Sequence, residues 1–213
     1  MRLLERTEWG AAAAERAPRP HPITSQGGAV RDVFLHHSVT GASPFSQMCR
    51  QIQRIHLDHP SIPYTDVAYN FLVSNETDEA AVGRGALAQG GATRGRNGDS
   101  LAICAVGWFS PGHDTPTPQL VTNIAGLLRK LIKDGHVAPD FRLLGHREAS
   151  ATECPGGLLF AQIGRIEALA KAVDPVAPVD PSAPDLALLT AVFTEQERSA
   201  AKILAMLREH RKG

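Results

Sequence analysis

The chain has no excess charge of either sign, because 22 Lys and Arg residues balance 22 Asp and Glu residues over its 213 residues. A nucleic-acid binder shows a basic excess, so the balance argues against that class of partner. No stretch reaches the roughly 18–20 apolar residues that a membrane span needs. Met1–Gly10 is charged and lacks the apolar core of a signal peptide. We therefore expect synthesis in a cytoplasm and no export by the usual route.

Cysteine is scarce and odd in number: the chain has Cys49, Cys104 and Cys154. An odd set favours a reduced compartment without a disulfide framework. Each cysteine is then a metal ligand, a nucleophile or a core residue. Cys49, on the apolar face of a predicted helix, and Cys104, in an apolar run, are interpreted as core residues.

The composition changes once, near Val173. Asp174–Asp185 reads DPVAPVDPSAPD and contains four prolines, which favour an extended, semi-rigid linker. The sequence therefore predicts a main domain over 1–173, a linker over 174–185 and an amphipathic helix over 186–213. The apolar residues of this last segment alternate by four and three. Three roles stay open for it: packing back onto the domain, self-association, or anchoring to a cell wall.

Short apolar or β-branched runs alternate with segments of helical spacing in the main domain. Such alternation predicts an α/β fold, with a mixed central β-sheet flanked by helices. Thr117 is the predicted N-cap of one helix. The predicted strands are Val33–His36, Val67–Ser74, Ala80–Gly83, Ser100–Val106 and Arg142–Gly145, and the predicted helices are Phe45–Leu57, Pro118–Leu131 and Leu158–Val173.

Three residues have the side chains that a catalytic zinc ion prefers. His36 ends the run VFLH, and His146 and Cys154 lie eight positions apart in GHREASATECPGG. Catalytic zinc sites take three protein ligands and keep a fourth position for water, and imidazole and thiolate suit this ion. The spacing alone is weak, because such pairs are common by chance. His56, His59 and His113 are interpreted as residues of exposed loops or helix ends.

Four motifs occur in a fixed order: FLHHSVTG, DVAYNFLV, GRNGDSLAICAVG and GHREASATECPG. Together they resemble the zinc amidase family that is shared by phage amidases and animal peptidoglycan recognition proteins. The opening ERTEWGA also resembles the SRxEWGA start of the recognition proteins. The resemblance runs from about Arg6 to Phe160. It implies a mixed sheet flanked by helices, with Zn²⁺ in a substrate groove.

The resemblance implies a role for five residues. The first histidine of the HH pair, the histidine of GHRE and the cysteine before Pro-Gly are the family's zinc ligands, here His36, His146 and Cys154. The tyrosine of the family's D-x-x-Y-N/H-F motif is here Tyr69, which implies a catalytic role. Thr152 stands two positions before the ligand cysteine, where some relatives have lysine and others threonine, and is the second catalytic candidate.

Two motifs depart from relatives. Many relatives have histidine in GAHAxGxN, and we take Thr93 of GGATRGRN as the matching residue. Thr93, Arg94, Asn97 and His37 are the predicted substrate-binding residues. One branch of the family, which acts on small anhydro-muropeptides in wall recycling, uses a glutamate that falls here on Cys104.

The sequence therefore predicts a zinc-dependent N-acetylmuramoyl-L-alanine amidase, with bacterial peptidoglycan as partner and substrate. A phage endolysin, made in the host cytoplasm and acting on the cell wall, is the expected setting. Two alternatives stay open: a recognition module that binds peptidoglycan without cutting it, and a cytoplasmic amidase of wall recycling. The complete ligand set disfavours the first, and the absent glutamate disfavours the second.

Overall fold

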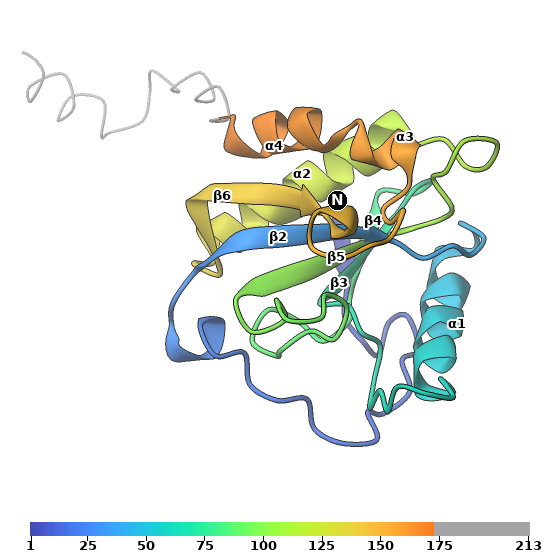
Figure 1. The fold of residues 1–213 in the computed structure, drawn as a ribbon, viewed down its shortest axis with the longest axis vertical. Coiled ribbons are helices and arrows are strands. Elements are labelled where there is room, and N and C mark those ends of the chain that lie inside the picture. Colours follow the sequence, from blue (N-terminus) through green and yellow to red (C-terminus); the bar gives the residue numbers. More distant parts are fainter. Residues whose placement is uncertain (173–213) are drawn as a thin grey trace, which may run out of the picture. The chain divides into compact units, whose positions relative to one another are not determined.

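Six strands form one mixed β-sheet in the order β1-β4-β3-β5-β2-β6 (Figure 1). The computed structural model describes residues 1–172, so the predicted linker and the C-terminal helix over 186–213 lie outside the described residues. Strands β3, β5, β2 and β6 are parallel, and β4 pairs antiparallel with β3. The strands are β1 (Arg2–Leu4), β2 (Val30–His37), β3 (Phe71–Ser74), β4 (Glu79–Val82), β5 (Ser100–Val106) and β6 (Val137–Gly145).

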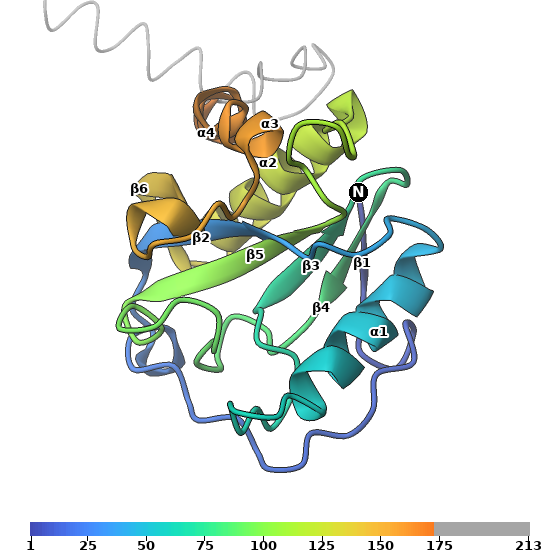
Figure 2. The ribbon, with the colours of Figure 1, turned by 45° about the vertical axis from the view of Figure 1, so that its right-hand side comes forward.

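Helices cover both faces of the sheet (Figure 2). On one face, α2 and α4 bury the larger apolar cluster, which includes Val33 and Leu35 of β2. On the other face, α1 packs over a smaller cluster that contains Cys49 and Cys104. The helices are α1 (Phe45–Leu57), α2 (Pro118–Lys133), α3 (Gly157–Phe160) and α4 (Ile163–Lys171), with short 3₁₀ turns at η1 (Thr24–Gln26) and η2 (His146–Glu148). The predicted fold class is confirmed, and both cysteines are core residues as expected.

Several predicted elements differ in their bounds from the structure: β2 begins at Val30 rather than Val33, and β6 at Val137 rather than Arg142. The strand expected over Val67–Ser74 begins only at Phe71. Two backbone amides before Phe71 donate to side chains and not to a neighbouring strand. Val67 N–H donates to the Asp66 carboxylate, and Ala68 N–H donates to His56 Nδ1. The helix expected over Leu158–Val173 is divided into α3 and α4. The N-cap is confirmed, since Thr117 Oγ1 accepts from the Leu120 amide at 3.1 Å.

The register of the sheet sets the place of the functional residues. Leu35 of β2 lies opposite Gly145 of β6 in a parallel pair, so His36 and His146 follow at the same edge. Side chains alternate between faces along a strand. Since Leu35 belongs to the cluster under α2, His36 faces the side of α1, where it pairs in register with Cys104 of β5. Within residues 1–172, no helix is long and apolar enough to cross a membrane.

Candidate metal centre

The structure brings together the three predicted zinc ligands. The ligand atoms of His36, His146 and Cys154 all lie within 4.8 Å of one another. Cys154 Sγ is 3.6 Å from His36 Nδ1, and the two imidazole rings have centroids 4.5 Å apart. His36 is 2% exposed and Cys154 is 8% exposed. Two imidazoles and one thiol at this spacing can hold a metal ion, and they form the donor set that zinc prefers.

A tight loop returns the chain from His146 to Cys154. The Arg147 amide donates to the Cys154 carbonyl at 2.9 Å, and the Arg147 guanidinium donates to the Glu153 carbonyl. Beyond the cysteine, Gly156 adopts a φ of 87°, and a Cβ there would lie 2.4 Å from the Phe109 carbonyl oxygen. Only glycine fits this close approach. The ECPGG sequence therefore lets the loop pack against the backbone of Phe109, which follows β5, while Cys154 stays at the cluster.

Burial keeps the ligand groups uncharged when no metal is bound. Desolvation, followed by the charges of His146, His37 and His56, holds the pKa of His36 well below its ordinary value. Burial also lowers the pKa of His146 and raises the pKa of the Cys154 thiol to about 11. Neutral imidazole is the form that ligates a metal, whereas the thiol must lose its proton on binding.

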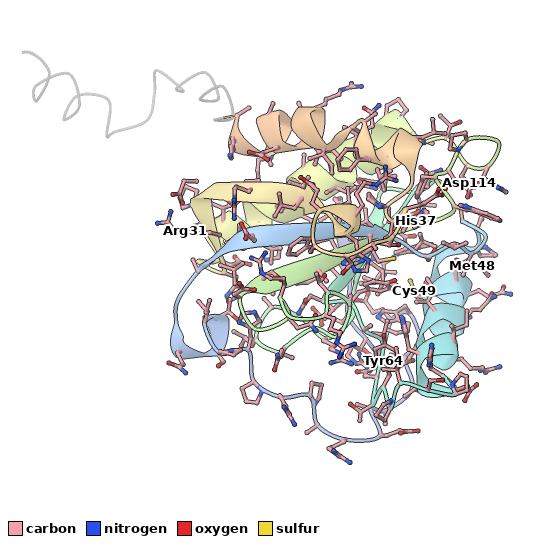
Figure 3. The ribbon with its side chains drawn as sticks, in the orientation of Figure 1. Arg31, His37, Met48, Cys49, Tyr64 and Asp114 are labelled. Atoms are coloured by element: carbon pink, nitrogen blue, oxygen red, sulfur yellow. The ribbon has the colours of Figure 1, made fainter. Side chains whose placement is uncertain are left out.

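A row of aromatic rings leads away from the cluster toward the end of α1. Ring centroids are 5.3 Å apart for His36 and Tyr69, 5.4 Å for Tyr69 and His56, and 4.9 Å for His56 and Tyr64 (Figure 3 labels Tyr64). Burial raises the pKa of Tyr69 well above its ordinary value, so its hydroxyl keeps its proton and can donate a hydrogen bond. The row forms one wall beside the metal centre.

His56 and Tyr64 are the residues of this wall to which the sequence analysis assigned no role in the site. His56 lies in the last turn of α1, near a helix end as predicted, and His113 is exposed as predicted, but His56 and His59 are half-buried. Burial, followed by the charge of Arg84, lowers the pKa of His56 to about 4. No periodic signal marks His56, because its contact with Tyr69 is made across the loop that joins α1 to β3.

The predicted substrate-binding residues divide between the two faces of the sheet. Thr93 is 1% exposed, and its Oγ1 lies 3.1 Å from His36 Nε2. Asn97 Oδ1 accepts from the Thr93 amide at 2.8 Å, while Arg94 is exposed. His37, labelled in Figure 3, is buried on the face opposite His36, where its Nδ1 accepts from the Phe109 amide at 3.3 Å. The side chain of Thr93 thus lies against the cluster, whereas His37 contacts it with its backbone N–H, which donates to Cys154 Sγ at 3.4 Å.

The motif match for Thr93 needs a correction. Set letter against letter, GGATRGRN places Ala92 at the histidine of GAHAxGxN and Thr93 at the next position. The prediction that Thr93 replaces that histidine is therefore wrong by one position. Thr152, the second catalytic candidate, is exposed, and its Oγ1 accepts from the Cys154 amide at 3.2 Å.

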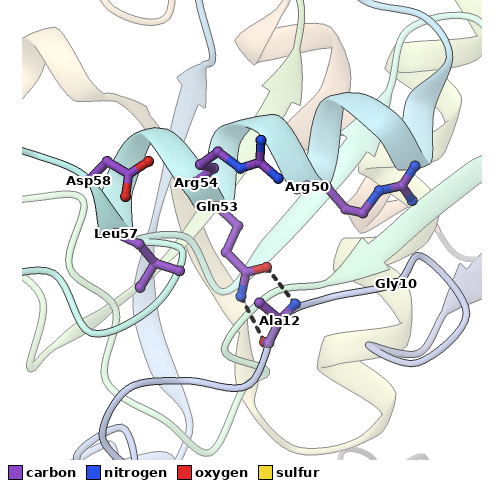
Figure 4. Close-up of a pocket in the computed structure, with 7 residues that line it drawn as sticks. All are labelled: Gly10, Ala12, Arg50, Gln53, Arg54, Leu57 and Asp58. Atoms are coloured by element: carbon purple, nitrogen blue, oxygen red, sulfur yellow. Dashed lines mark hydrogen bonds between the residues drawn. The ribbon is translucent and has the colours of Figure 1, made fainter.

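One of two hollows near the end of α1 adjoins the wall of rings. The first, of about 420 Å³, includes Tyr64 among its lining residues together with Arg16, Arg19 and Arg84. The second, of about 320 Å³, lies between α1 and the N-terminal segment, where the Gln53 amide group exchanges two hydrogen bonds with the backbone of Ala12 (Figure 4). The first hollow continues the row of rings that begins at His36, whereas no predicted site residue lines the second.

A family model described as N-acetylmuramoyl-L-alanine amidase matches residues 26–157. The chain belongs to this amidase family. The matched range contains the whole cluster of His36, His146 and Cys154, together with Tyr69 and Thr93.

Known relatives carry two kinds of name. Peptidoglycan-recognition protein LE of Drosophila melanogaster is 30% identical over 165 residues, which cover 76% of this chain and 45% of that protein. The N-acetylmuramoyl-L-alanine amidase of Sus scrofa is 28% identical over 162 residues, covering 73% of this chain and 25% of that protein. The chain thus spans less than half of either relative's length.

A solved structure of a family relative has the same fold. It is the crystal structure of peptidoglycan recognition protein LE in complex with tracheal cytotoxin, described as monomeric diaminopimelic acid-type peptidoglycan. It superposes with a TM-score of 0.69 at 30% identity, covering 76% of this chain and 92% of that chain. Family membership therefore includes proteins that bind peptidoglycan fragments and proteins named as amidases.

Proposed function

We propose that this protein is a zinc-dependent amidase that hydrolyses the bond between N-acetylmuramic acid and L-alanine in peptidoglycan. The observation that carries the proposal is the convergence of His36, His146 and Cys154 within 4.8 Å, in a chain of the amidase family. The donor set of two imidazoles and one thiolate matches a catalytic zinc site with three protein ligands. A zinc ion held by these three residues would supply Lewis-acid chemistry, polarising the scissile carbonyl and lowering the pKa of a water toward ~7.

We assign two hydroxyl groups a part in the hydrolysis. Tyr69 packs against His36 and stays protonated, so its hydroxyl can donate to the oxyanion that develops on the scissile carbonyl. Thr152 uses its oxygen to accept from the Cys154 amide, which leaves its own O–H free to donate. One well-placed donor to such an oxyanion lowers the activation free energy by roughly 3–4 kcal/mol.

The wall of rings gives the substrate a direction. The hollow at its far end is lined by Arg16, Arg19 and Arg84, and the peptide stems of peptidoglycan carry carboxylates. Opposite charges attract across such a basic hollow. We therefore place the amide bond at the metal centre and the peptide stem along His56 and Tyr64, toward the arginines.

Incubation of the protein with intact peptidoglycan tests the proposal. We expect new L-alanine amino termini and free lactyl groups on muramic acid, with no new reducing sugar ends. Because the metal is required, a zinc chelator should stop this release and added zinc should restore it. Retention of zinc and muropeptide without any release of amines would instead identify a recognition module.

Replacement of Tyr69 by phenylalanine is expected to lower kcat by about 10²–10³-fold, the range found on removing one oxyanion donor. The change keeps the ring that packs on His36 and removes only the hydroxyl, so zinc content and KM should stay near wild type. Zinc content, kcat and KM on muropeptide are the measurements. Tyr64→Phe, farther along the same wall and away from the scissile bond, is the matched control for kcat. A kcat within twofold of wild type would remove Tyr69 from the mechanism.

We propose lysis of a bacterial host by a phage as the biological setting, with synthesis in the host cytoplasm and action on the wall. The support is the resemblance of the four motifs to phage amidases, and the position of Cys104 where the wall-recycling branch has glutamate. Expression in a bacterium should cause lysis only when a second protein opens the membrane. Opened cells that keep their walls intact would argue against this setting.

A further inference from the structure

The two ring nitrogens of His36 have different neighbours. Nδ1 lies 3.6 Å from Cys154 Sγ, on the side of the metal centre. Nε2 lies 3.1 Å from Thr93 Oγ1, on the other side of the ring. His36 and Thr93 are 2% and 1% exposed, so bulk water does not compete for this contact. The hydroxyl of Thr93 is thus a buried partner dedicated to one nitrogen.

A neutral imidazole has one N–H group and one lone pair, and the lone pair binds a metal. The nitrogen that faces the centre must therefore be bare, and the proton must sit on Nε2. We infer that Thr93 is a positioning residue for His36: its oxygen accepts the Nε2 hydrogen and so presents the lone pair of Nδ1 to Cys154 and His146. This inference rests on the zinc-binding part of the proposed function. It assigns Thr93 a role other than the predicted contact with substrate.

The loop that carries Thr93 is fastened to the strand that carries His36. Asn97 Oδ1 accepts from the Thr93 amide at 2.8 Å, and the Arg96 amide donates to the Thr93 carbonyl at 3.0 Å. The Arg96 guanidinium donates to the buried Asp32 carboxylate at 2.5 Å. Asp32 and His36 both belong to β2 and lie on the same face of the sheet. The loop is therefore held within itself at Thr93 and to β2 through Arg96. These bonds fix the Thr93 hydroxyl beside the His36 imidazole.

A hydroxyl in this place acts as an outer partner of a metal ligand. Such partners fix the tautomer and the ring orientation of the histidine, and their loss typically weakens metal affinity by about 10–100-fold. Thr93→Val replaces the hydroxyl by a methyl group of similar size. We expect it to weaken zinc binding by about 10–100-fold, whereas Thr93→Ser, which keeps the hydroxyl, stays within about threefold of wild type.

Zinc affinity is measured on the full chain by competition with a chromophoric chelator. Thr122→Val is the matched control, because it makes the same change on the exposed side of α2, and it should leave the affinity unchanged. Far-ultraviolet circular dichroism checks that each variant is folded. Equal zinc affinities of wild type and Thr93→Val would overturn the inference alone. Failure of the wild type to bind zinc would overturn the proposed function, and this inference with it.

Nitrogen-15 spectra of the histidine rings in the zinc-free protein give a second readout that is independent of activity. The wild type and Thr93→Ser should show His36 with its proton on Nε2. Thr93→Val should show a larger fraction with the proton on Nδ1. A wild-type His36 protonated on Nδ1 would overturn the inference, because that nitrogen would then have no lone pair for a metal.

Discussion

Replacement of Cys154 by alanine is expected to remove zinc binding and amide hydrolysis together. Cys154 supplies the thiol of the cluster and lies within 4.8 Å of both histidine ligand atoms. Loss of an outer partner alone costs roughly 10–100-fold in metal affinity, so loss of a ligand should cost more than about 100-fold. The release of L-alanine amines should fall to background. Zinc content after dialysis and amine release are the measurements.

Zinc binding by the wild type should displace the proton of the Cys154 thiol. Burial raises the pKa of the Cys154 thiol to about 11, so at pH 7 the metal-free protein holds this proton on Sγ. A thiol that coordinates a metal is deprotonated outright. Calorimetric titrations in two buffers should therefore show about one proton released per zinc bound by the wild type. A value near zero would contradict thiolate ligation.

Cys49→Ala is the matched control for this experiment. Cys49 is also fully buried, but it lies in α1 within the apolar cluster. Burial raises its pKa to about 12, and its replacement should leave zinc content and amine release unchanged. The wild type and Cys49→Ala should also gain thermal stability from added zinc by mass action, unlike Cys154→Ala. Equal zinc retention by Cys154→Ala and the wild type would remove Cys154 from the ligand set.

Hydropathy and spacing predicted the strands and the helix that surround the site, because buried strands and amphipathic helices have recognisable patterns of apolar residues. The apolar runs that became β2 and β5 were recognisable as buried strands, and helical spacing gave α1 with its bounds. The meeting of His36 and His146 depends on β2 and β6 being adjacent and parallel. Local sequence does not state which strands are neighbours, so the resemblance was needed to join the ligands.

Contacts between segments that are far apart in the chain could not be predicted from the sequence. The bond from His36 to Thr93 joins residues 57 positions apart, and the packing of His56 on Tyr69 depends on where α1 lies over the sheet. The sequence could have predicted which face of the sheet the His37 side chain occupies, because side chains alternate along a strand. Its neighbour His36 faces the metal centre, so the alternation alone turns His37 to the other side.

Acidification from pH 7 to pH 4 is expected to lower the free energy of unfolding, with His37 contributing about 3 kcal/mol to the loss. Burial, followed by the charge of Arg147, lowers the pKa of His37 to about 4. The unfolded chain takes up this proton near the ordinary pKa of about 6.5. Between these values the unfolded state binds more protons, so stability falls as the pH falls. Below about pH 4 both states are protonated, and the loss from His37 is complete.

The surroundings of His37 explain why it resists protonation. Its Nδ1 accepts from the Phe109 amide at 3.3 Å, and a proton on that nitrogen would break the bond and leave a buried N–H without its acceptor. His37→Asn keeps an oxygen that can accept from the same amide, but it does not titrate. Urea unfolding of both proteins at pH 7.0, 5.5 and 4.5, with a chelator present, measures the difference.

The wild type should lose stability more steeply with acid than His37→Asn. Burial also lowers the pKa values of His36 and His56, but both residues are present in the two proteins, so this effect of their burial cancels in the difference. The divergence should begin just below pH 6.5 and account for most of about 3 kcal/mol by pH 4.5. Parallel pH curves for the two proteins would show that His37 takes up its proton equally in the folded and unfolded states. Burial of His37 would then have no influence on the acid stability of this protein.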